Sequence, residues 1–241
     1  MEKVREELLT RYPFYQPVEG YRYSMDALLL AGFVREQRGR RGAPIRCLDI
    51  GTGSGIITLL LSKRFPGYRY SAVEIQEELC TIARENFALH GQEVELIQGD
   101  YHDLEGRSCF DLIVSNPPFF KGGSISRNRS LAIARHEIHA SMETLVAKAG
   151  TLLAPGGFLY LIYPAQRLGE LMALMEQHRI SPFALKTVHP RREMEAEVVL
   201  VAGKKGHKGG LSLLSPFIVY EEGEDYSPEA IRLYEEDVIR W

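Results

Sequence analysis

Short apolar runs alternate with amphipathic stretches along most of this chain, and that alternation predicts an α/β fold. The runs are too brief for helices and are typical of buried strands: 45–50, 68–73, 94–98, 110–114 and 158–163. Helical spacing of the apolar positions occupies the intervals between them: 56–65, 77–90, 136–153 and 166–178. Two further strands are expected at 183–189 and 197–202. Strands separated by helices form a mostly parallel, Rossmann-like sheet with helices on both faces.

The 241-residue length fits one domain of the larger kind, with enough core to fold alone. We expect an amino-terminal extension at 1–43 with one or two helices, a core at 44–203, and a tail at 204–241. No internal repeat is visible in the sequence.

Polar side chains stand at the carboxyl ends of four successive predicted strands. They are Asp49, Glu74, Asp100 and Asn116. Glu74 or Asp100 alone is better explained as a solvated helix cap. Open α/β sheets bind their ligands at this edge, so the set of four predicts a ligand site there.

The first of these strands runs into a glycine loop, Asp49-Ile-Gly51-Thr-Gly53-Ser-Gly55, and then into a helix. Glycines let a backbone take positive φ and approach a ligand closely. Ile56 stands where the dinucleotide fingerprint needs its third glycine, so the loop is a different nucleotide-binding variant. An acid about twenty residues on, Glu74, suits the two ribose hydroxyls of an adenosine. Asp100 can accept from an adenine amino group.

The fourth strand ends in Asn116-Pro117-Pro118-Phe119. The residue before a proline is held extended, so the Asn116 amide points beyond the strand end. Its oxygen and amino group can grip a planar amine, and Phe119 can stack on the same plane. A simple Asn-Pro turn followed by an apolar contact is the alternative interpretation of this tetrapeptide.

The glycine loop and the Asn-Pro-Pro-Phe element resemble those of the class I S-adenosylmethionine-dependent methyltransferases. Residues 21–31, 116–123 and 135–137 are similar to segments of the bacterial tRNA(Val) adenine-N6 methyltransferase family. The resemblance implies a seven-stranded sheet with its last strands antiparallel, S-adenosylmethionine as cofactor with S-adenosylhomocysteine as product, and Tyr23 and Asp26 beside the cofactor. Phe119 departs from the family, which often has Tyr there; the change keeps stacking but loses a hydroxyl.

The implied reaction is N6-methylation of an adenine in RNA, with tRNA(Val) favoured. Three other readings stay open: a guanine-N2 methyltransferase of ribosomal RNA, a protein glutamine-N5 methyltransferase, and a non-catalytic cofactor- or RNA-binding module. Residues 1–43 are short for the separate helical domain of a glutamine methyltransferase. A module that only binds has no need to orient an amine with Asn116.

The net charge of −3 does not suit a dedicated nucleic-acid binder, so only local groups of charged residues are informative about function. Basic residues gather after the fourth strand, at Lys121, Arg127, Arg129 and Arg135. Others lie near the last two strands, at Arg191, Arg192, Lys204, Lys205, His207 and Lys208. We expect the first group, with Arg191 and Arg192, to contact structured RNA.

The remaining composition favours a cytoplasmic protein. The amino terminus lacks the apolar core of a signal peptide, and no apolar run could span a bilayer. Cys47, Cys80 and Cys109 read as buried thiols in a reducing compartment. No Cys or His spacing suggests a metal site. The sequence does not indicate an oligomeric state.

Overall fold

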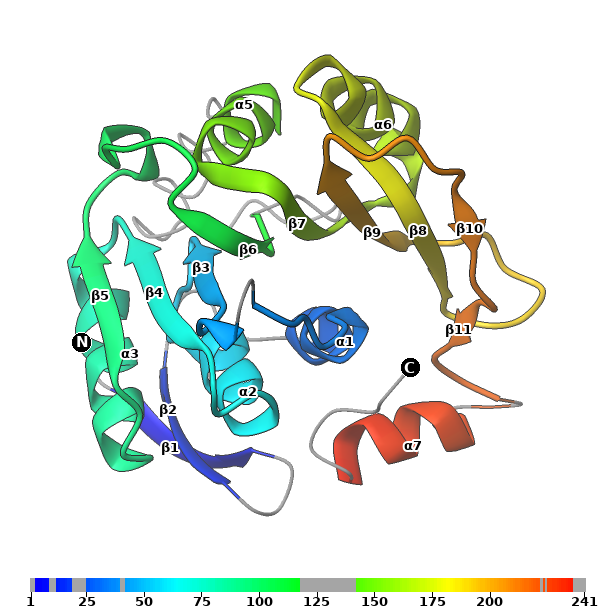
Figure 1. Cartoon of the computed structure of the whole chain (residues 1–241). Coiled ribbons are helices and arrows are strands. Elements are labelled where there is room, and N and C mark those ends of the chain that lie inside the picture. The colour runs from blue at the N-terminus through cyan, green and yellow to red at the C-terminus, as the bar shows by residue number, and fades with distance from the viewer. Residues whose placement is uncertain are drawn as a thin grey trace.

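A computed structural model describes residues 3–8, 12–18, 25–39, 42–117, 142–221, 223 and 225–235. Its centre is a sheet whose seven longer strands coincide with the predicted ones. They are β3 (Arg46–Ile50), β4 (Arg69–Glu74), β5 (Val94–Gln98), β6 (Phe110–Ser115), β7 (Leu153–Pro164), β8 (Ile180–His189) and β9 (Val198–Lys205). Their order across the sheet is β8-β9-β7-β6-β3-β4-β5 (Figure 1).

The expected strand number of seven is wrong, since the sheet has nine strands among the described residues. The two additional strands, β10 (Ser212–Leu213) and β11 (Phe217–Ile218), are two residues long and both pair parallel to β8. Runs this short carry no periodicity that a sequence pattern could reveal. β9 is antiparallel to both β7 and β8, as the resemblance implied.

Helices cover both faces of the sheet (Figure 1). On one face α1 (Met25–Phe33) and α2 (Ile56–Arg64) share an apolar core with the sheet. On the other face α5 (Met142–Leu152) and α6 (Leu168–Gln177) form a second core. α3 (Glu77–Leu89) contacts β4 and β5, and the carboxyl-terminal α7 (Pro228–Glu235) contacts α1. This layering is what the alternating pattern predicted.

The described part of the amino-terminal extension contains one helix of the expected one or two, α1, and a hairpin that was not expected. A hairpin of β1 (Lys3–Leu8) and β2 (Tyr12–Pro17) precedes α1, and β2 packs against α3. Phe14 and Gln16, two residues apart, are both buried, as expected for positions on one face of a strand. Two prolines in six residues hide this alternation from a sequence reading.

Parallel pairing brings the carboxyl ends of β3, β4, β5 and β6 to one edge of the sheet, which we call the upper edge. The register aligns Glu74 with Gln98 and Ile50 with Val73. β8 runs in the same direction and ends at this edge, whereas the antiparallel β9 begins there. The polar residues that follow β3 to β6 are therefore neighbours, as predicted.

Candidate functional site

The glycine loop between β3 and α2 uses the backbone freedom of its glycines. Gly51, Gly53 and Gly55 have φ of 72°, 60° and 89°, a region that costs other residues strain. A Cβ on Gly55 would lie 2.7 Å from the Phe87 ring, so α3 presses directly on the loop. A Cβ on Gly51 would meet nothing within 4 Å. The loop is thus packed on the Gly55 side and open at Gly51, where a ligand could approach it.

Asp49 is a buried acid at the base of this loop, with 1% of its surface exposed. Its Oδ2 accepts hydrogen bonds from the hydroxyls of Thr52 at 2.7 Å and Thr58 at 2.8 Å. Among the described residues no donor reaches its buried Oδ1. Burial raises the pKa of Asp49 to about 6, with the two threonine bonds opposing the rise. An orphaned buried acceptor is costly, and a donor group on a ligand would satisfy it.

Glu74 ends β4 and is 5% exposed. Its Oε2 accepts from the Gly53 N–H at 2.8 Å and its Oε1 from the Gln76 N–H at 2.9 Å. Burial raises the pKa of Glu74, while the backbone donors counteract this. Both oxygens keep further lone pairs, so the fixed carboxylate suits a pair of ribose hydroxyls.

Asp100 follows β5 and is half-buried. It caps a short 3-10 turn at Tyr101–Asp103, since its Oδ1 accepts from the His102 N–H at 2.8 Å. Asp100 therefore has the capping role, and its binding of an adenine amino group stays a prediction.

Asn116 and Pro117 follow β6 at the upper edge and are half-buried. The neighbouring Ser115 hydroxyl donates to the Ile50 carbonyl at 2.7 Å, which ties the end of β6 to the end of β3. Asp26 lies in the first turn of α1, half-buried. Several predicted site residues lie outside the described residues: Tyr23, Pro118, Phe119, Lys121, Arg127, Arg129 and Arg135.

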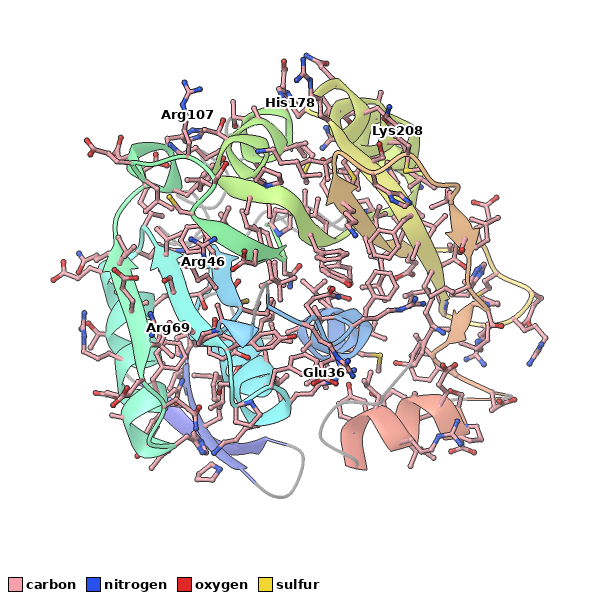
Figure 2. The ribbon with its side chains drawn as sticks, viewed as in Figure 1. Glu36, Arg46, Arg69, Arg107, His178 and Lys208 are labelled. Carbon is pink, nitrogen blue, oxygen red and sulfur yellow. The ribbon has the colours of Figure 1, made fainter. Side chains whose placement is uncertain are left out.

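The basic residues near the last strands are not one cluster. Arg191 and Arg192 lie in the turn between β8 and β9, at the upper edge with Asn116. Arg191 donates to the Glu221 carbonyl at 2.8 Å, and Arg192 is exposed. Lys204 and the basic residues after it lie at or beyond the far end of β9, at the opposite edge. In Figure 2, Lys208 lies along the top border of the view with Arg107 and His178. Arg107 precedes β6 and His178 precedes β8, so this part of the border belongs to the opposite edge and not to the one we call upper.

The sequence reading missed the two threonines that hold Asp49. Thr58 is 1% exposed and is a polar residue within the apolar run 56–61 of α2. A buried hydroxyl needs a hydrogen-bond partner. A threonine inside an apolar helical run, nine residues after Asp49, was therefore the sequence signal for this bond.

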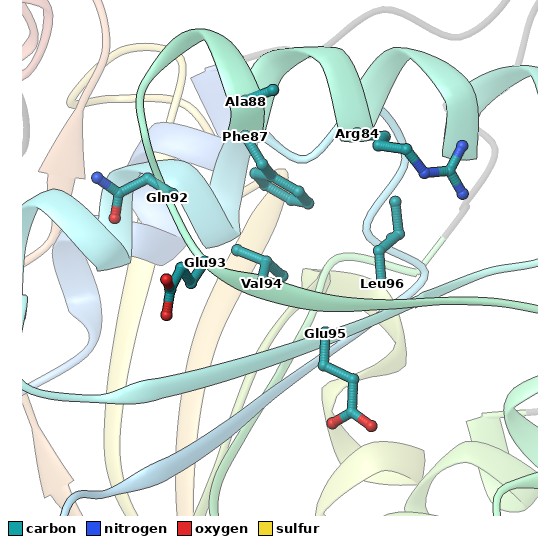
Figure 3. Close-up of a pocket in the computed structure, with 8 residues that line it drawn as sticks. All are labelled: Arg84, Phe87, Ala88, Gln92, Glu93, Val94, Glu95 and Leu96. Atoms are coloured by element: carbon teal, nitrogen blue, oxygen red, sulfur yellow. The ribbon is translucent and has the colours of Figure 1, made fainter.

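Other features of the described residues lie apart from the predicted site. A hollow between α3 and β5 contains none of the predicted residues (Figure 3); its lining is Arg84, Phe87, Ala88 and 92–96. In the described ranges no group of three Cys, His, Asp or Glu could hold a metal ion. No described helix is long and apolar enough to cross a membrane. Cys47 and Cys80 are buried free thiols, whereas Cys109, expected to be buried, is half-exposed.

Comparison with known proteins decides the family. The model of the methyltransferase small domain matches residues 27–179, from α1 to the start of β8. The chain belongs to this methyltransferase family. The matched range contains the glycine loop, Glu74, Asp100 and Asn116. This methyltransferase is therefore an enzyme, and most of its predicted site residues lie within the matched range. Tyr23, Asp26, Arg191 and Arg192 lie outside it.

Curated relatives resemble the methyltransferase over most of its length. A tRNA1(Val) (adenine(37)-N6)-methyltransferase from Porphyromonas gingivalis is 35% identical over 225 residues, which is 89% of this chain and 87% of that protein. A protein of the same name from Aeromonas hydrophila is 33% identical and covers 75% of both chains.

Solved structures show the same fold. A predicted O-methyltransferase from Agrobacterium tumefaciens has a TM-score of 0.68 at 24% identity, covering 89% of this chain and 98% of its own. The geranyl diphosphate C-methyltransferase of Streptomyces coelicolor, crystallised with S-adenosyl-L-homocysteine, has a TM-score of 0.51 at 13% identity. It covers 69% of this chain and 72% of its own. The Rossmann-like methyltransferase fold predicted from the sequence is confirmed.

Proposed function

We propose that this methyltransferase transfers a methyl group from S-adenosylmethionine to N6 of an adenine in tRNA, with tRNA(Val) as the favoured substrate. The observation that carries the proposal is the position of Asn116 and Pro117 at the upper edge, on a strand that Ser115 ties to the base of the glycine loop. Relatives that carry the name of this activity align with 75–89% of the chain.

The cofactor-binding residues of the proposal surround the glycine loop. Gly51 leaves open space for a ligand beside the backbone, and Glu74 offers an anchored carboxylate to the ribose. Asp49 presents the orphaned Oδ1, and Asp100 follows the adjacent strand. Gly53 and Gly55 shape the loop, while Tyr23 and Asp26 complete the set. S-adenosylmethionine supplies an electrophilic methyl group when it is bound.

The substrate-binding residues of the proposal are Asn116, Pro117, Pro118 and Phe119. The Asn116 side-chain oxygen and the Pro117 carbonyl accept from the N6 amine and orient its lone pair. A base inside an RNA stem or loop must leave its stack to reach them. Positioning of this kind contributes on the order of 7–11 kcal/mol to lowering a barrier. Stacking on Phe119 adds about 1–3 kcal/mol to binding.

RNA binding in this proposal uses the basic residues of the upper edge. Lys121, Arg127, Arg129 and Arg135 follow Asn116 in the sequence, and Arg191 and Arg192 lie at the same edge of the sheet. Arginine side chains suit phosphate oxygens because their forked donors bind them in pairs. We propose a cytoplasmic location, where tRNA is available as a substrate.

Methyl transfer from labelled S-adenosylmethionine tests this function. The purified protein is given tRNA, ribosomal RNA or total protein, each prepared from cells that lack the gene. The proposal expects label in tRNA and none in the other two pools. Label in ribosomal RNA would favour the guanine-N2 reading, and label in protein the glutamine-N5 reading. Absence of label from all three pools would favour the non-catalytic module.

A further inference from the structure

Asn86 is a buried polar residue that the proposed reaction does not use. It lies in the last turn of α3 and has 0% of its surface exposed. Asparagine is a poor helix former, and burial of an amide is costly unless it is hydrogen-bonded. Its presence in α3 therefore requires an explanation from its contacts.

The Asn86 amide joins two segments that are far apart in the sequence. Its Oδ1 accepts from the Tyr15 N–H at 2.7 Å, and its Nδ2 donates to the Tyr15 carbonyl at 3.0 Å. The same Nδ2 donates to the Ser54 carbonyl at 2.8 Å. Tyr15 belongs to β2 of the amino-terminal hairpin, and Ser54 lies between the second and third glycines of the loop.

The loop is consequently held from two sides. Glu74, at the end of β4, accepts from the Gly53 N–H. From α3, Asn86 binds the Ser54 carbonyl, and the ring of the next residue, Phe87, is so close that a Cβ on Gly55 would lie 2.7 Å from it. Figure 3 shows Phe87 extending from α3 toward β5, beneath the helix. The hairpin, α3 and the loop thus form one continuous chain of contacts.

We propose that Asn86 is a positioning residue that couples the amino-terminal hairpin to the glycine loop. Cofactor affinity then depends on the docking of the hairpin on α3. The inference rests on the proposed function, because it takes the loop as the cofactor site. It assigns the hairpin a role that its sequence did not suggest.

His90, the residue that follows α3, provides a control. Its Nε2 lies 2.7 Å from the Pro13 carbonyl, so its side chain contacts the hairpin beside the end of the helix. His90→Ala removes this hairpin contact. Asn86→Asp removes both donated bonds, including the one to the loop, and keeps the shape of the side chain.

The experiment is calorimetric titration of S-adenosylmethionine into the parent, Asn86→Asp, Asn86→Leu and His90→Ala proteins. Because unsatisfied buried partners carry a desolvation penalty, we expect each Asn86 variant to raise Kd by about tenfold. His90→Ala should raise it by less than about threefold. In steady-state assays at a saturating RNA concentration, the Asn86 variants should change kcat less than they change the KM for the cofactor. The reason is that Asn86 does not touch the reacting atoms.

Amide hydrogen exchange of the cofactor-free proteins tests the coupling itself. Residues 52–58 and Tyr15 should exchange faster in both Asn86 variants than in the parent. Should these variants fail to fold, Tyr15→Pro serves instead. It removes the backbone N–H that donates a hydrogen bond to Asn86 Oδ1 and leaves Asn86 in place. It should likewise speed exchange at 52–58 and weaken cofactor binding.

Folded Asn86 variants with parental Kd and parental exchange would overturn the inference and leave the proposed function intact. Equal effects of His90→Ala and the Asn86 variants on Kd would also overturn it, since the loss would then not depend on the bond from Asn86 to the loop. A parent that binds no S-adenosylmethionine would overturn the proposed function, and hydrogen exchange would still decide the coupling.

Discussion

Asp49→Asn should stabilise the cofactor-free protein at neutral pH and weaken cofactor binding. The carboxylate is buried, and one of its oxygens has no donor among the described residues. An asparagine in its place can still accept from Thr52 and Thr58, and it carries no charge that would need solvation.

The magnitude follows from the raised pKa of Asp49. A carboxyl whose pKa is higher in the folded than in the unfolded state stabilises the fold when the pH is below its pKa in the unfolded state. That stability is lost as pH rises from 3.8 to about 6 and stays lost above it. The difference of about 2 pH units corresponds to at most about 3 kcal/mol at neutral pH.

Urea unfolding of parent and variant from pH 4 to pH 8 measures this directly. The variant's advantage in free energy of unfolding should grow by up to about 3 kcal/mol between pH 4 and about pH 6 and then level off. Asp103→Asn, at an exposed position, controls for removal of any carboxylate. Parallel curves for parent and Asp49→Asn would refute the reasoning, because they would show that burial does not penalise this charge.

Four other perturbations separate the parts of the site. Gly55→Ala should destabilise the fold by about 1–3 kcal/mol through its contact with Phe87. Gly51→Ala carries a similar positive-φ strain but meets no protein atom, so it should destabilise the fold less than Gly55→Ala does and, in calorimetry, weaken cofactor binding more; equal losses of stability and of affinity in the two variants would contradict the assignment. Asn116→Ala should keep cofactor affinity within a few-fold of the parent and slow single-turnover methyl transfer by on the order of 10²-fold, and a normal rate would make it a turn residue. Replacing both Arg191 and Arg192 by Ala should lower the salt slope of tRNA binding by about two units, whereas Lys208→Ala at the opposite edge should leave it unchanged.

Local patterns predicted the centre of this molecule well. Strands β3 to β6 are short apolar runs in the sequence, and each stands between turn residues or helical spacing. The glycines of the loop follow from the positive φ that the turn requires. Because parallel strands end at a common edge, the sequence also placed Asp49, Glu74, Asp100 and Asn116 together.

Features that depend on distant contacts were not predictable from such patterns. The hairpin is stabilised against α3 through Asn86, seventy-one residues after Tyr15. The basic residues 191–208 separated because β9 is antiparallel and carries Lys204 away from the site. Thr58 reads as one polar residue in an apolar helix until the fold brings it to Asp49.

Nucleoside mass spectrometry of tRNA after reaction tests the central claim most directly. Unmodified tRNA(Val), made by transcription in vitro, is incubated with the purified protein and S-adenosylmethionine, with Asn116→Ala protein in a parallel reaction. The account predicts N6-methyladenosine in the parent reaction and, at an early time point, on the order of 10²-fold less with Asn116→Ala. A methylated nucleoside other than N6-methyladenosine, or the same yield from both proteins, would contradict it.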